Sequence, residues 1–350
     1  MRKLNRLNVA LIGRGFMGRS HSNAWSQVNK FFQAPLPVVM HTIAGRSGSA
    51  PTEFARTWGW QNAASDWKKV VASDDIDLVD IVTPNNWHAP MAKAAIAAGK
   101  PCACEKPIAG TLKEAREMAQ AALKANVPTF VWFNYRRVPA VALAHQMVKA
   151  GKIGQIRHVR AFYLQEWAGP DVPLAWRFDK KLAGSGAHGD LNAHIVDMTR
   201  FVTGEEITEI CGAIAHTFIK ERKLISGGAG GQIAAGLKSS KGMGKVTVDD
   251  AVLFLARFSG GAVASFEAAR QATGNYNRNG FEINPTNDFA DDDQFAADMT
   301  CLARLVGLGD FVGSGDCSGV QADSIPMSTP LTARVAPALA SVVVIVTTTR

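Results

Sequence analysis

Cysteine is scarce in this sequence and is not arranged in pairs. The 350 residues contain five cysteines, an odd number, and no C-x-x-C pair occurs among them. This pattern excludes a disulfide framework, and without a histidine-rich cluster nearby it also excludes a structural zinc site. We interpret the five as ordinary buried or free thiols: Cys102, Cys104, Cys211, Cys301 and Cys317.

Long apolar runs are also missing. Before the C-terminal end, no stretch approaches the roughly 20 apolar residues that a membrane helix needs. The first residues, Met1 to Arg6, lead into a strand-like segment and not into the apolar region of a signal peptide. We therefore expect a cytoplasmic protein without a membrane partner.

The positive charge of the chain is not concentrated. The formal net charge is +8, but Lys and Arg are scattered and do not interleave with aromatic residues. Because a nucleic-acid surface needs basic residues massed on one face, we expect no nucleic-acid partner. A small anionic ligand such as a dinucleotide accounts for part of the charge equally well.

The first 133 residues alternate between short apolar segments and helix-like segments. The strand-like segments are 8–13, 38–44, 78–83, 101–105 and 128–133. The helix-like segments are 17–30, 52–58, 88–98 and 111–126, with Gly99 closing the third and Thr111 placed to cap the fourth. This alternation predicts a parallel sheet covered on both faces.

The second half of the chain has a different rhythm. Long strand-like segments cover 156–166, 209–218, 246–258 and 262–268. Ser259-Gly260-Gly261 separates the last two and predicts a hairpin, so this half is predicted to form an antiparallel sheet. One helix is predicted over 190–202 and ends at Gly204, and the Gly-, Ser- and Lys-rich stretch 226–244 is predicted to be a flexible loop.

Gly13-Arg14-Gly15-Phe16-Met17-Gly18 matches G-x-G-x-x-G between a predicted strand and a predicted helix. In this context the first glycine permits the tight turn, the second lets the backbone approach a pyrophosphate, and the third allows close helix packing. The helix N-terminus offers free N–H groups to the phosphates. The alternative is a glycine-rich turn without a ligand.

The second strand lacks the acidic residue that usually binds the ribose of NAD. It ends in Gly45-Arg46-Ser47, and a guanidinium with a hydroxyl suits a 2′-phosphate. We therefore predict NAD(P) as cofactor, with NADP favoured over NAD. Arg46 could instead be a solvated loop residue.

Two later segments follow strands of the predicted parallel sheet. Thr83-Pro84-Asn85-Asn86-Trp87-His88 comes after one of them, at the edge where such sheets bind ligands. Glu105 and Lys106 end another strand that is otherwise apolar, so their charges are predicted to emerge at the same edge. The alternative for Lys106 is an ordinary surface lysine.

Together these motifs resemble the Gfo/Idh/MocA family of NAD(P)-dependent sugar oxidoreductases. The resemblance covers residues 8–284 and rests on an ordered set: the glycine turn, 83–85 with His88, 105–107, 134–137, and 186–197. It implies an α/β fold, with an N-terminal Rossmann domain followed by a C-terminal α+β domain with a large open, mainly antiparallel sheet. Segments 133–137, 163–167, 176–178 and 184–186 are most similar to the levoglucosan dehydrogenase-like branch, which implies an anhydrosugar, cyclic polyol or pyranose substrate.

Carried over position by position, the resemblance implies a catalytic trio of Lys106, Asp190 and His194. It implies substrate contacts for Tyr135, Gln165, Trp176 and Arg177. The predicted cofactor contacts are Gly13, Gly15, Phe16, Met17, Gly18, Arg46, Ser47, Thr83, Pro84, Asn85, His88, Glu105, Lys106 and Asn134.

The chemistry of alcohol oxidation suits the trio. A base must take the hydroxyl proton as hydride leaves, an imidazole titrates in the right range, and a lysine can stabilise developing negative charge. Asp190 lies four residues before His194, on the same predicted helical face, and can bond a sugar hydroxyl or steer the imidazole. Alternatively, Asp190 begins the helix as a cap and His194 is a core histidine.

The neighbouring residues are assigned lesser roles. Asp197 is expected to orient a neighbouring group. His188 has no third histidine spaced to help it bind a metal, so we expect no metal. Trp167 and Trp176 are platforms for a sugar ring or ordinary packing residues.

The resemblance ends after Asn284. We predict three regions: a Rossmann domain over 1–133, a substrate and oligomerisation domain over 134–284, and an atypical tail over 285–350, disordered or frame-shifted. A homo-oligomer through the open sheet is expected if the tail permits it. The main functional hypothesis is a sugar or polyol oxidoreductase; the alternatives are a glycosidase that uses NAD transiently and an inactive cofactor-binding protein.

Overall fold

The computed structural model describes residues 4–46, 50–225, 239–286, 331–334 and 342–348. The chain divides into two compact units. The N-terminal unit comprises residues 1–132, 173–185 and 221–246, and the C-terminal unit comprises 133–172, 186–220 and 247–350. The predicted region boundaries stay predictions.

The N-terminal unit contains a six-stranded parallel sheet in the order β3-β2-β1-β4-β5-β6. Its strands are β1 (Leu7–Ile12), β2 (Val38–Ala44), β3 (Asn62–Ala64), β4 (Leu78–Ile81), β5 (Cys102–Cys104) and β6 (Thr129–Val131). The strand order reverses direction between β1 and β4, which is the switch point where sheets of this type bind dinucleotides. The predicted Rossmann architecture is confirmed.

Helices cover both faces of this sheet. They are α1 (Phe16–Phe31), α2 (Ala50–Trp58), α3 (Trp67–Ala72), α4 (His88–Ala97) and α5 (Leu112–Ala125). Strand β1 sends Val9 and Leu11 into one apolar core and Ala10 and Ile12 into another. Such a strand, buried on both sides, explains the continuous apolar run seen in the sequence.

Local sequence signals predicted most of these elements correctly but missed the shortest ones. The Thr111 hydroxyl accepts a hydrogen bond from the Glu114 N–H, which confirms the predicted cap of α5. Strand β3 and helix α3 were not predicted, since three and six residues are too short for a periodic pattern.

The C-terminal unit contains a seven-stranded sheet in the order β14-β15-β13-β7-β12-β11-β8. Its strands are β7 (Ile156–Leu164), β8 (Ile207–His216), β11 (Ala251–Phe258), β12 (Val263–Ala269), β13 (Arg278–Pro285), β14 (Leu331–Arg334) and β15 (Val342–Thr348). Neighbouring strands are antiparallel except for β12 and β7, which are parallel. The mainly antiparallel sheet is confirmed, with one parallel pair that the sequence did not indicate.

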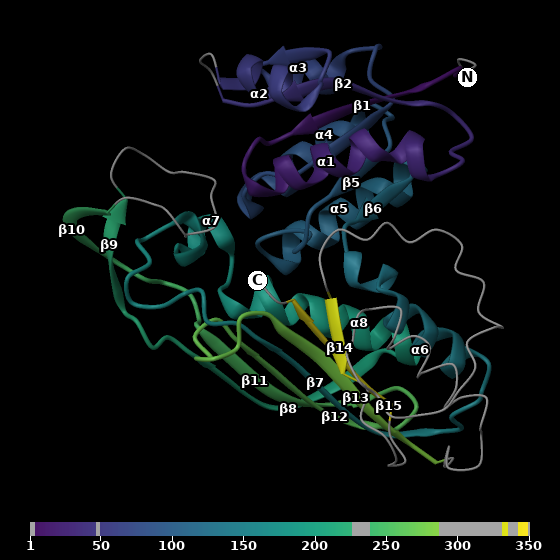
Figure 1. Ribbon diagram of the computed structural model, residues 1–350, viewed down its shortest axis with the longest axis vertical. Helices are drawn as coiled ribbons and strands as arrows, with labels where there is room; N and C mark the ends of the chain where they lie inside the picture. Colours follow the sequence, from purple (N-terminus) through teal and green to yellow (C-terminus); the bar gives the residue numbers. More distant parts are fainter. Residues whose placement is uncertain (1–3, 47–49, 226–238, 287–330, 335–341, 349–350) are drawn as a thin grey trace. The chain divides into compact units, whose positions relative to one another are not determined.

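Helices α6 (Pro139–Lys149) and α8 (Ala193–Thr203) lie on one face of this sheet (Figure 1). Their apolar residues, including Val141 and Ile195, pack with Phe266 and Phe281 of the strands. On β11 alternate residues such as Leu253 and Leu255 are exposed instead. The second sheet face is therefore open in the described part of the chain.

The predicted turns of the C-terminal unit are confirmed, and one loop prediction is wrong in part. Strands β11 and β12 form the expected hairpin, and Gly204 ends α8 in the left-handed conformation.

Within the predicted loop 226–244, residues 226–238 lie outside the described residues, but β10 (Ser239–Lys245) pairs with β9 (Glu221–Ile225). The partner strand supplies the hydrogen bonds that hold this Gly- and Ser-rich segment extended.

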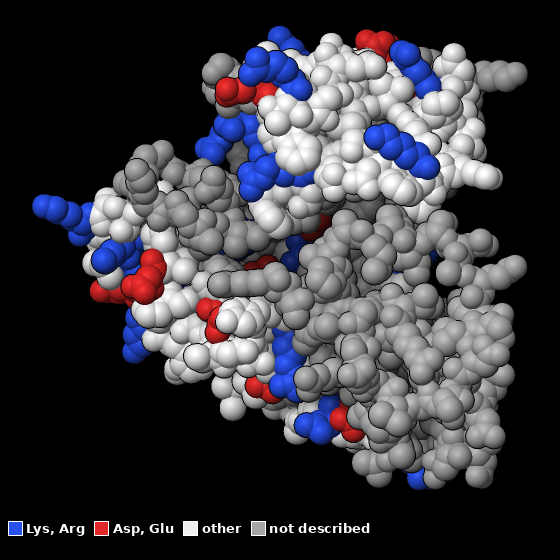
Figure 2. Space-filling model, viewed as in Figure 1, with Lys and Arg blue, Asp and Glu red and all other residues white. Residues whose placement is uncertain are grey.

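Much of the predicted tail, 285–350, lies outside the described residues, as do Cys301 and Cys317. The described parts include β14 and β15, and β15 pairs with β13. In the ranges that the structure covers, no helix is both long and apolar enough to cross a membrane. On the face drawn in Figure 2, the Lys and Arg side chains lie singly or in small groups among neutral and acidic residues.

Candidate functional site

The turn between β1 and α1 has a geometry that only glycine permits. Gly13 has a φ of +120°, and a Cβ there would lie 2.7 Å from the Val82 carbonyl oxygen. A Cβ on Gly18 would lie 2.5 Å from the Gly13 carbonyl oxygen. The backbone segments at the ends of β1 and β4 and at the start of α1 are therefore so close that Gly13 and Gly18 have no room for a side chain.

This turn fits the diphosphate of a dinucleotide. Gly15 precedes α1, and among the described residues no side chain caps that helix end. The first N–H groups of α1 are therefore left for an anion, with the positive end of the helix dipole behind them. Phe16 begins the helix and is partly exposed, whereas Met17 packs into the core beside β1.

The residues after β2 are only partly described. Arg46 is exposed, as a residue that meets a ribose phosphate would be, and Ser47 lies outside the described residues. The predicted cofactor contact through Ser47 therefore stays a prediction.

The segment after β4 forms a short 3₁₀ helix, η1 (Asn85–Trp87), whose polar side chains hold other loops in place. His88 is fully buried; its Nδ1 lies 2.9 Å from the Pro107 carbonyl oxygen and its Nε2 lies 2.9 Å from that of Thr83. The Asn85 amide donates to the Ala183 carbonyl oxygen at 2.8 Å. Both residues therefore fix the loops at this sheet edge, whatever contact they also make with a cofactor.

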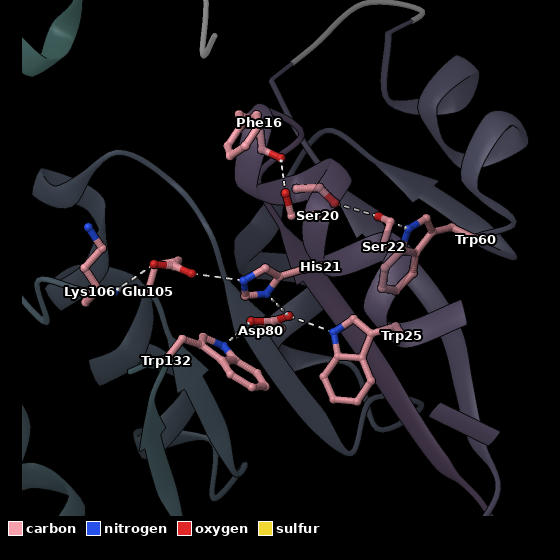
Figure 3. A network of polar contacts seen from close by, with 11 residues as sticks. Phe16, Ser20, His21, Ser22, Trp25, Trp60, Asp80, Glu105, Lys106 and Trp132 are labelled. Carbon is pink, nitrogen blue, oxygen red and sulfur yellow. Dashed lines mark hydrogen bonds and ion pairs between the residues drawn. The ribbon is translucent and has the colours of Figure 1, made fainter. Parts of the chain in front are cut away.

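Glu105 and Lys106 follow β5 and adjoin a buried network that the sequence did not predict (Figure 3). His21 of α1 places its Nδ1 2.8 Å from Asp80 Oδ2 and its Nε2 3.0 Å from Glu105 Oε1. The other Glu105 oxygen accepts the Lys106 backbone N–H at 3.1 Å. One signal for it was available, since Asp80 is a lone carboxylate within an apolar strand.

The two carboxylates decide the protonation of His21. Burial alone would lower its pKa, but the charges and hydrogen bonds of Asp80 and Glu105 outweigh burial and raise the pKa from 6.5 to about 10. His21 is thus an imidazolium between two carboxylates.

We expect the stability of the protein to fall as the pH rises towards 10. Because the folded pKa of His21 is raised, its contribution is complete below the unfolded value of 6.5 and is lost up to about 10. Chemical denaturation at several pH values should show a steeper loss of unfolding free energy for the wild type than for His21→Gln. Parallel curves for the two proteins would contradict this expectation.

In the C-terminal unit, His194 lies in a cluster of aromatic rings. Its ring meets Tyr135 edge-on at 4.8 Å between centroids, with Tyr163 at 5.9 Å and Phe133 at 6.4 Å. His194 is largely buried, at 9% exposed. The packing around His194 therefore holds its imidazole in a defined position.

A series of hydrogen-bonded polar side chains, the polar ladder, continues from this cluster and comprises Tyr135, Tyr163, Gln165 and Asn277. The Tyr135 and Tyr163 hydroxyls are 2.8 Å apart, and the Gln165 amide donates to the Tyr163 hydroxyl at 3.2 Å and to Asn277 Oδ1 at 2.6 Å. Burial raises the pKa of Tyr163 well above its usual range, so the phenol stays protonated. The structure therefore brings together Tyr135, Gln165 and His194, three of the predicted residues.

Asp190 lies in a π-helical turn, η4 (His188–Asn192), that precedes α8. Such turns are frequent at functional sites. The Asp190 N–H bonds the Gly186 carbonyl oxygen, so Asp190 is inside the helical run and does not cap it. The cap is Asp249, whose two carboxylate oxygens accept the N–H groups of Gly186 and His188, each at 2.8 Å.

Replacing Asp249 by alanine is expected to destabilise the C-terminal unit. The variant loses the acceptors for two N–H groups at the start of this helix, and loss of a helix cap costs about 1–2 kcal/mol. Chemical denaturation measures the change, and Asp249→Asn, which keeps one acceptor oxygen, should lose less. An unchanged unfolding free energy in Asp249→Ala would show that the cap is unimportant.

The remaining predicted residues occupy varied places. Asp197 pairs with Arg136, in line with the orienting role expected for it. Trp176 and Arg177 form η3 with Phe178 in the N-terminal unit, the guanidinium lying 4.4 Å from the indole centroid. Asn134 is exposed in η2 (Asn134–Arg137).

The predicted catalytic trio divides between the units, with Lys106 in the N-terminal and Asp190 and His194 in the C-terminal unit. His188 is exposed, and within the described ranges no group of three metal-binding side chains occurs.

Comparison with known proteins agrees with this fold. Residues 7–133 match an oxidoreductase family with an NAD-binding Rossmann fold, and residues 141–288 match the Gfo/Idh/MocA C-terminal domain. Levoglucosan dehydrogenase of Pseudarthrobacter phenanthrenivorans is 45% identical over 286 residues, which are 81% of this chain and 72% of that protein. The 1,5-anhydro-D-fructose reductase of Ensifer adhaerens is 31% identical over 248 residues, 71% of this chain and 65% of that protein.

Solved structures show the same relationship. Levoglucosan dehydrogenase in complex with NADH and levoglucosan superposes with a TM-score of 0.74 at 43% identity, covering 80% of this chain and 71% of that one. The resemblance inferred from the motifs is thereby confirmed. The chain belongs to the Gfo/Idh/MocA family and is an NAD-binding oxidoreductase.

Proposed function

We propose that this protein transfers a hydride between NAD(P) and a secondary alcohol carbon of a sugar, anhydrosugar or cyclic polyol. One observation carries the proposal: the turn at Gly13 and Gly18 excludes side chains and leaves the N-terminus of α1 for a diphosphate. The similarity to a levoglucosan dehydrogenase and to an anhydrofructose reductase supports an anhydrosugar or pyranose as the substrate class.

The proposed roles follow from the chemistry of each side chain. The bound nicotinamide would accept or donate the hydride. His194 takes the proton from the substrate hydroxyl, and its aromatic surroundings fix the ring for that transfer. Asp190 binds a neighbouring hydroxyl, and the Lys106 ammonium stabilises the negative charge that develops on the reacting oxygen.

Substrate recognition is assigned to the polar ladder beside His194. The Tyr135 hydroxyl can donate to or accept from a ring hydroxyl, the Gln165 amide oxygen can accept from one, and Tyr163 holds both side chains in place. Trp176 and Arg177 are proposed to contact the sugar as well. These assignments predict that hydroxyl stereochemistry affects kcat/KM more than the size of the substrate.

A panel of sugars, polyols and anhydrosugars, assayed with each cofactor for the ultraviolet absorbance of reduced nicotinamide, tests the function. Net reduced cofactor with an anhydrosugar or pyranose is the expected result. Sugar release without net reduction would support the glycosidase hypothesis instead, and dinucleotide binding without either reaction would indicate a protein that does not turn over.

The choice between NAD and NADP is tested at Arg46. An exposed guanidinium at the end of β2 favours the extra phosphate, so we propose NADP as the better cofactor. Arg46→Asp should lower kcat/KM for NADP by about 10-fold or more and affect NAD less. Higher efficiency of the wild type with NAD, whose reduced form NADH is bound in the levoglucosan dehydrogenase structure, would refute this preference.

We also propose that the open sheet face joins copies of this chain. Exposed apolar side chains on β8 and β11 make this face apolar: Ile214, which pairs with Leu253, and Leu253 and Leu255 themselves. Light scattering should show an oligomer, and Leu253→Lys should shift it towards the monomer. A monomeric wild type would refute the assignment.

A further inference from the structure

The network around His21 consists of ionisable side chains that are buried, although charged groups by themselves are more stable in water. The side chain of His21 is 11% exposed, and those of its partners Asp80 and Glu105 are 0% and 8% exposed. Burying three ionisable groups costs free energy that their mutual attraction offsets only in good geometry. Neither His21 nor Asp80 takes part in the chemistry proposed above.

The network links three elements that carry the dinucleotide turn and the lysine. His21 lies on α1, three residues after Gly18, and Asp80 lies on β4. Glu105 follows β5 and uses one oxygen for His21 and the other for the Lys106 N–H. Glu105 therefore joins the helix at the cofactor turn to the backbone of Lys106, whose side chain extends away from the network (Figure 3).

Two tryptophan indoles hold Asp80, the carboxylate that fixes one side of His21. Trp25 and Trp132 donate to the two oxygens of Asp80, at 2.8 and 2.9 Å. The Trp132 ring also meets His21 edge-on, at 5.2 Å between centroids. Because both Asp80 oxygens are engaged and His21 is enclosed, the imidazole has a fixed direction and its Nε2 points at Glu105 (Figure 3).

We propose that His21 is a positioning residue which, through Glu105, fixes the backbone of Lys106 relative to the helix that carries the dinucleotide turn. In this arrangement α1 resists displacement of the Lys106 backbone. The N-terminus of the helix and the lysine therefore keep a fixed position relative to each other. The catalytic consequence rests on the proposed function of Lys106, but the link from His21 to Lys106 can be measured without turnover.

The first readout is hydrogen exchange of the Lys106 amide, whose hydrogen bond to Glu105 the network supports. His21→Gln keeps a polar side chain but cannot pair with both carboxylates, so this exchange should become about 10-fold faster or more. The double variant His21→Gln with Glu105→Gln should be no faster than the more affected single variant, because the two residues act as one unit.

The matched control is Trp60→Phe. The Trp60 indole donates to Ser22, the neighbour of His21 on α1, at 2.9 Å, and it is also buried. This variant loses a buried hydrogen bond on the same helix without touching Glu105. It should lower Tm, as His21→Gln does, but leave the Lys106 exchange within about twofold of the wild type in conditions where the native state persists.

The second readout is steady-state kinetics with whichever sugar proves active. His21→Gln should lower kcat by about 10- to 100-fold, since small displacements of a reacting group are costly, and change the dinucleotide Kd less than about threefold. A purely structural role would lower Tm and leave kcat per folded molecule unchanged.

The proposal is overturned if folded His21→Gln exchanges the Lys106 amide at the wild-type rate. It is also overturned if Trp60→Phe accelerates that exchange equally, because the effect would then be general loosening of α1. If the wild type turns over no sugar, the proposed function fails, and the exchange experiment alone decides whether His21 holds Lys106.

Discussion

Replacing Gly13 by alanine is expected to weaken dinucleotide binding by about 100-fold. The new Cβ would lie 2.7 Å from the Val82 carbonyl oxygen, and the φ of +120° is one that residues with side chains rarely adopt. A backbone oxygen cannot rotate away as a side chain can, so the turn itself must shift. Titration calorimetry with NAD and NADP measures the loss.

Gly59→Ala is the matched control for this change. Gly59 also has a positive φ, +80°, but a Cβ there would meet nothing within 4 Å. This variant carries backbone strain without a clash, and it should lower Tm while leaving the dinucleotide Kd within about twofold. Wild-type affinity in Gly13→Ala would remove the basis of the proposed cofactor site.

Replacing His194 by asparagine, or Lys106 by methionine, is expected to lower kcat by about 10² to 10⁴-fold. Each variant removes a group assigned to the moving proton or to the developing charge. Neither removes a glycine of the diphosphate turn, so the dinucleotide Kd should change much less than kcat. Steady-state kinetics and calorimetry on the same preparations separate the two effects.

Each of these variants has a control of the same residue type. His145 is stacked on Phe201 and also lies in the C-terminal unit, and Lys93 pairs with Glu117 at 2.8 Å. His145→Asn and Lys93→Met should keep kcat within about twofold, although the first should reduce stability. If the His194 or Lys106 variant keeps wild-type turnover, that residue has no part in the proton or charge steps.

The cofactor half of the protein was predictable because its signals are local. Each signal involves only a few neighbouring residues: the three glycines between an apolar strand and a helix, Thr111 at a helix start, and the alternation of strands and helices. The structure confirms the parallel sheet and the cap. Strand β10 escaped prediction because its partner β9, not its own composition, makes it a strand.

The roles of polar residues depended on contacts that no local pattern reports. His88 has the position of a cofactor ligand in the sequence, yet in the structure both ring nitrogens meet backbone carbonyl oxygens. Asp190 has the position of a helix cap, yet Asp249, far along the chain, is the residue that caps this helix.

The sequence by itself determined that a dinucleotide-binding turn exists and where it lies, because glycine conformation and strand-to-helix order are properties of adjacent residues. Only the tertiary structure decided that His21 is charged and holds Glu105. Its partners are 59 and 84 residues away, and they meet it only because the sheet order places β4 and β5 beside α1. The charges and hydrogen bonds of those carboxylates, which outweigh the effect of burial on the pKa, set the state of that imidazole.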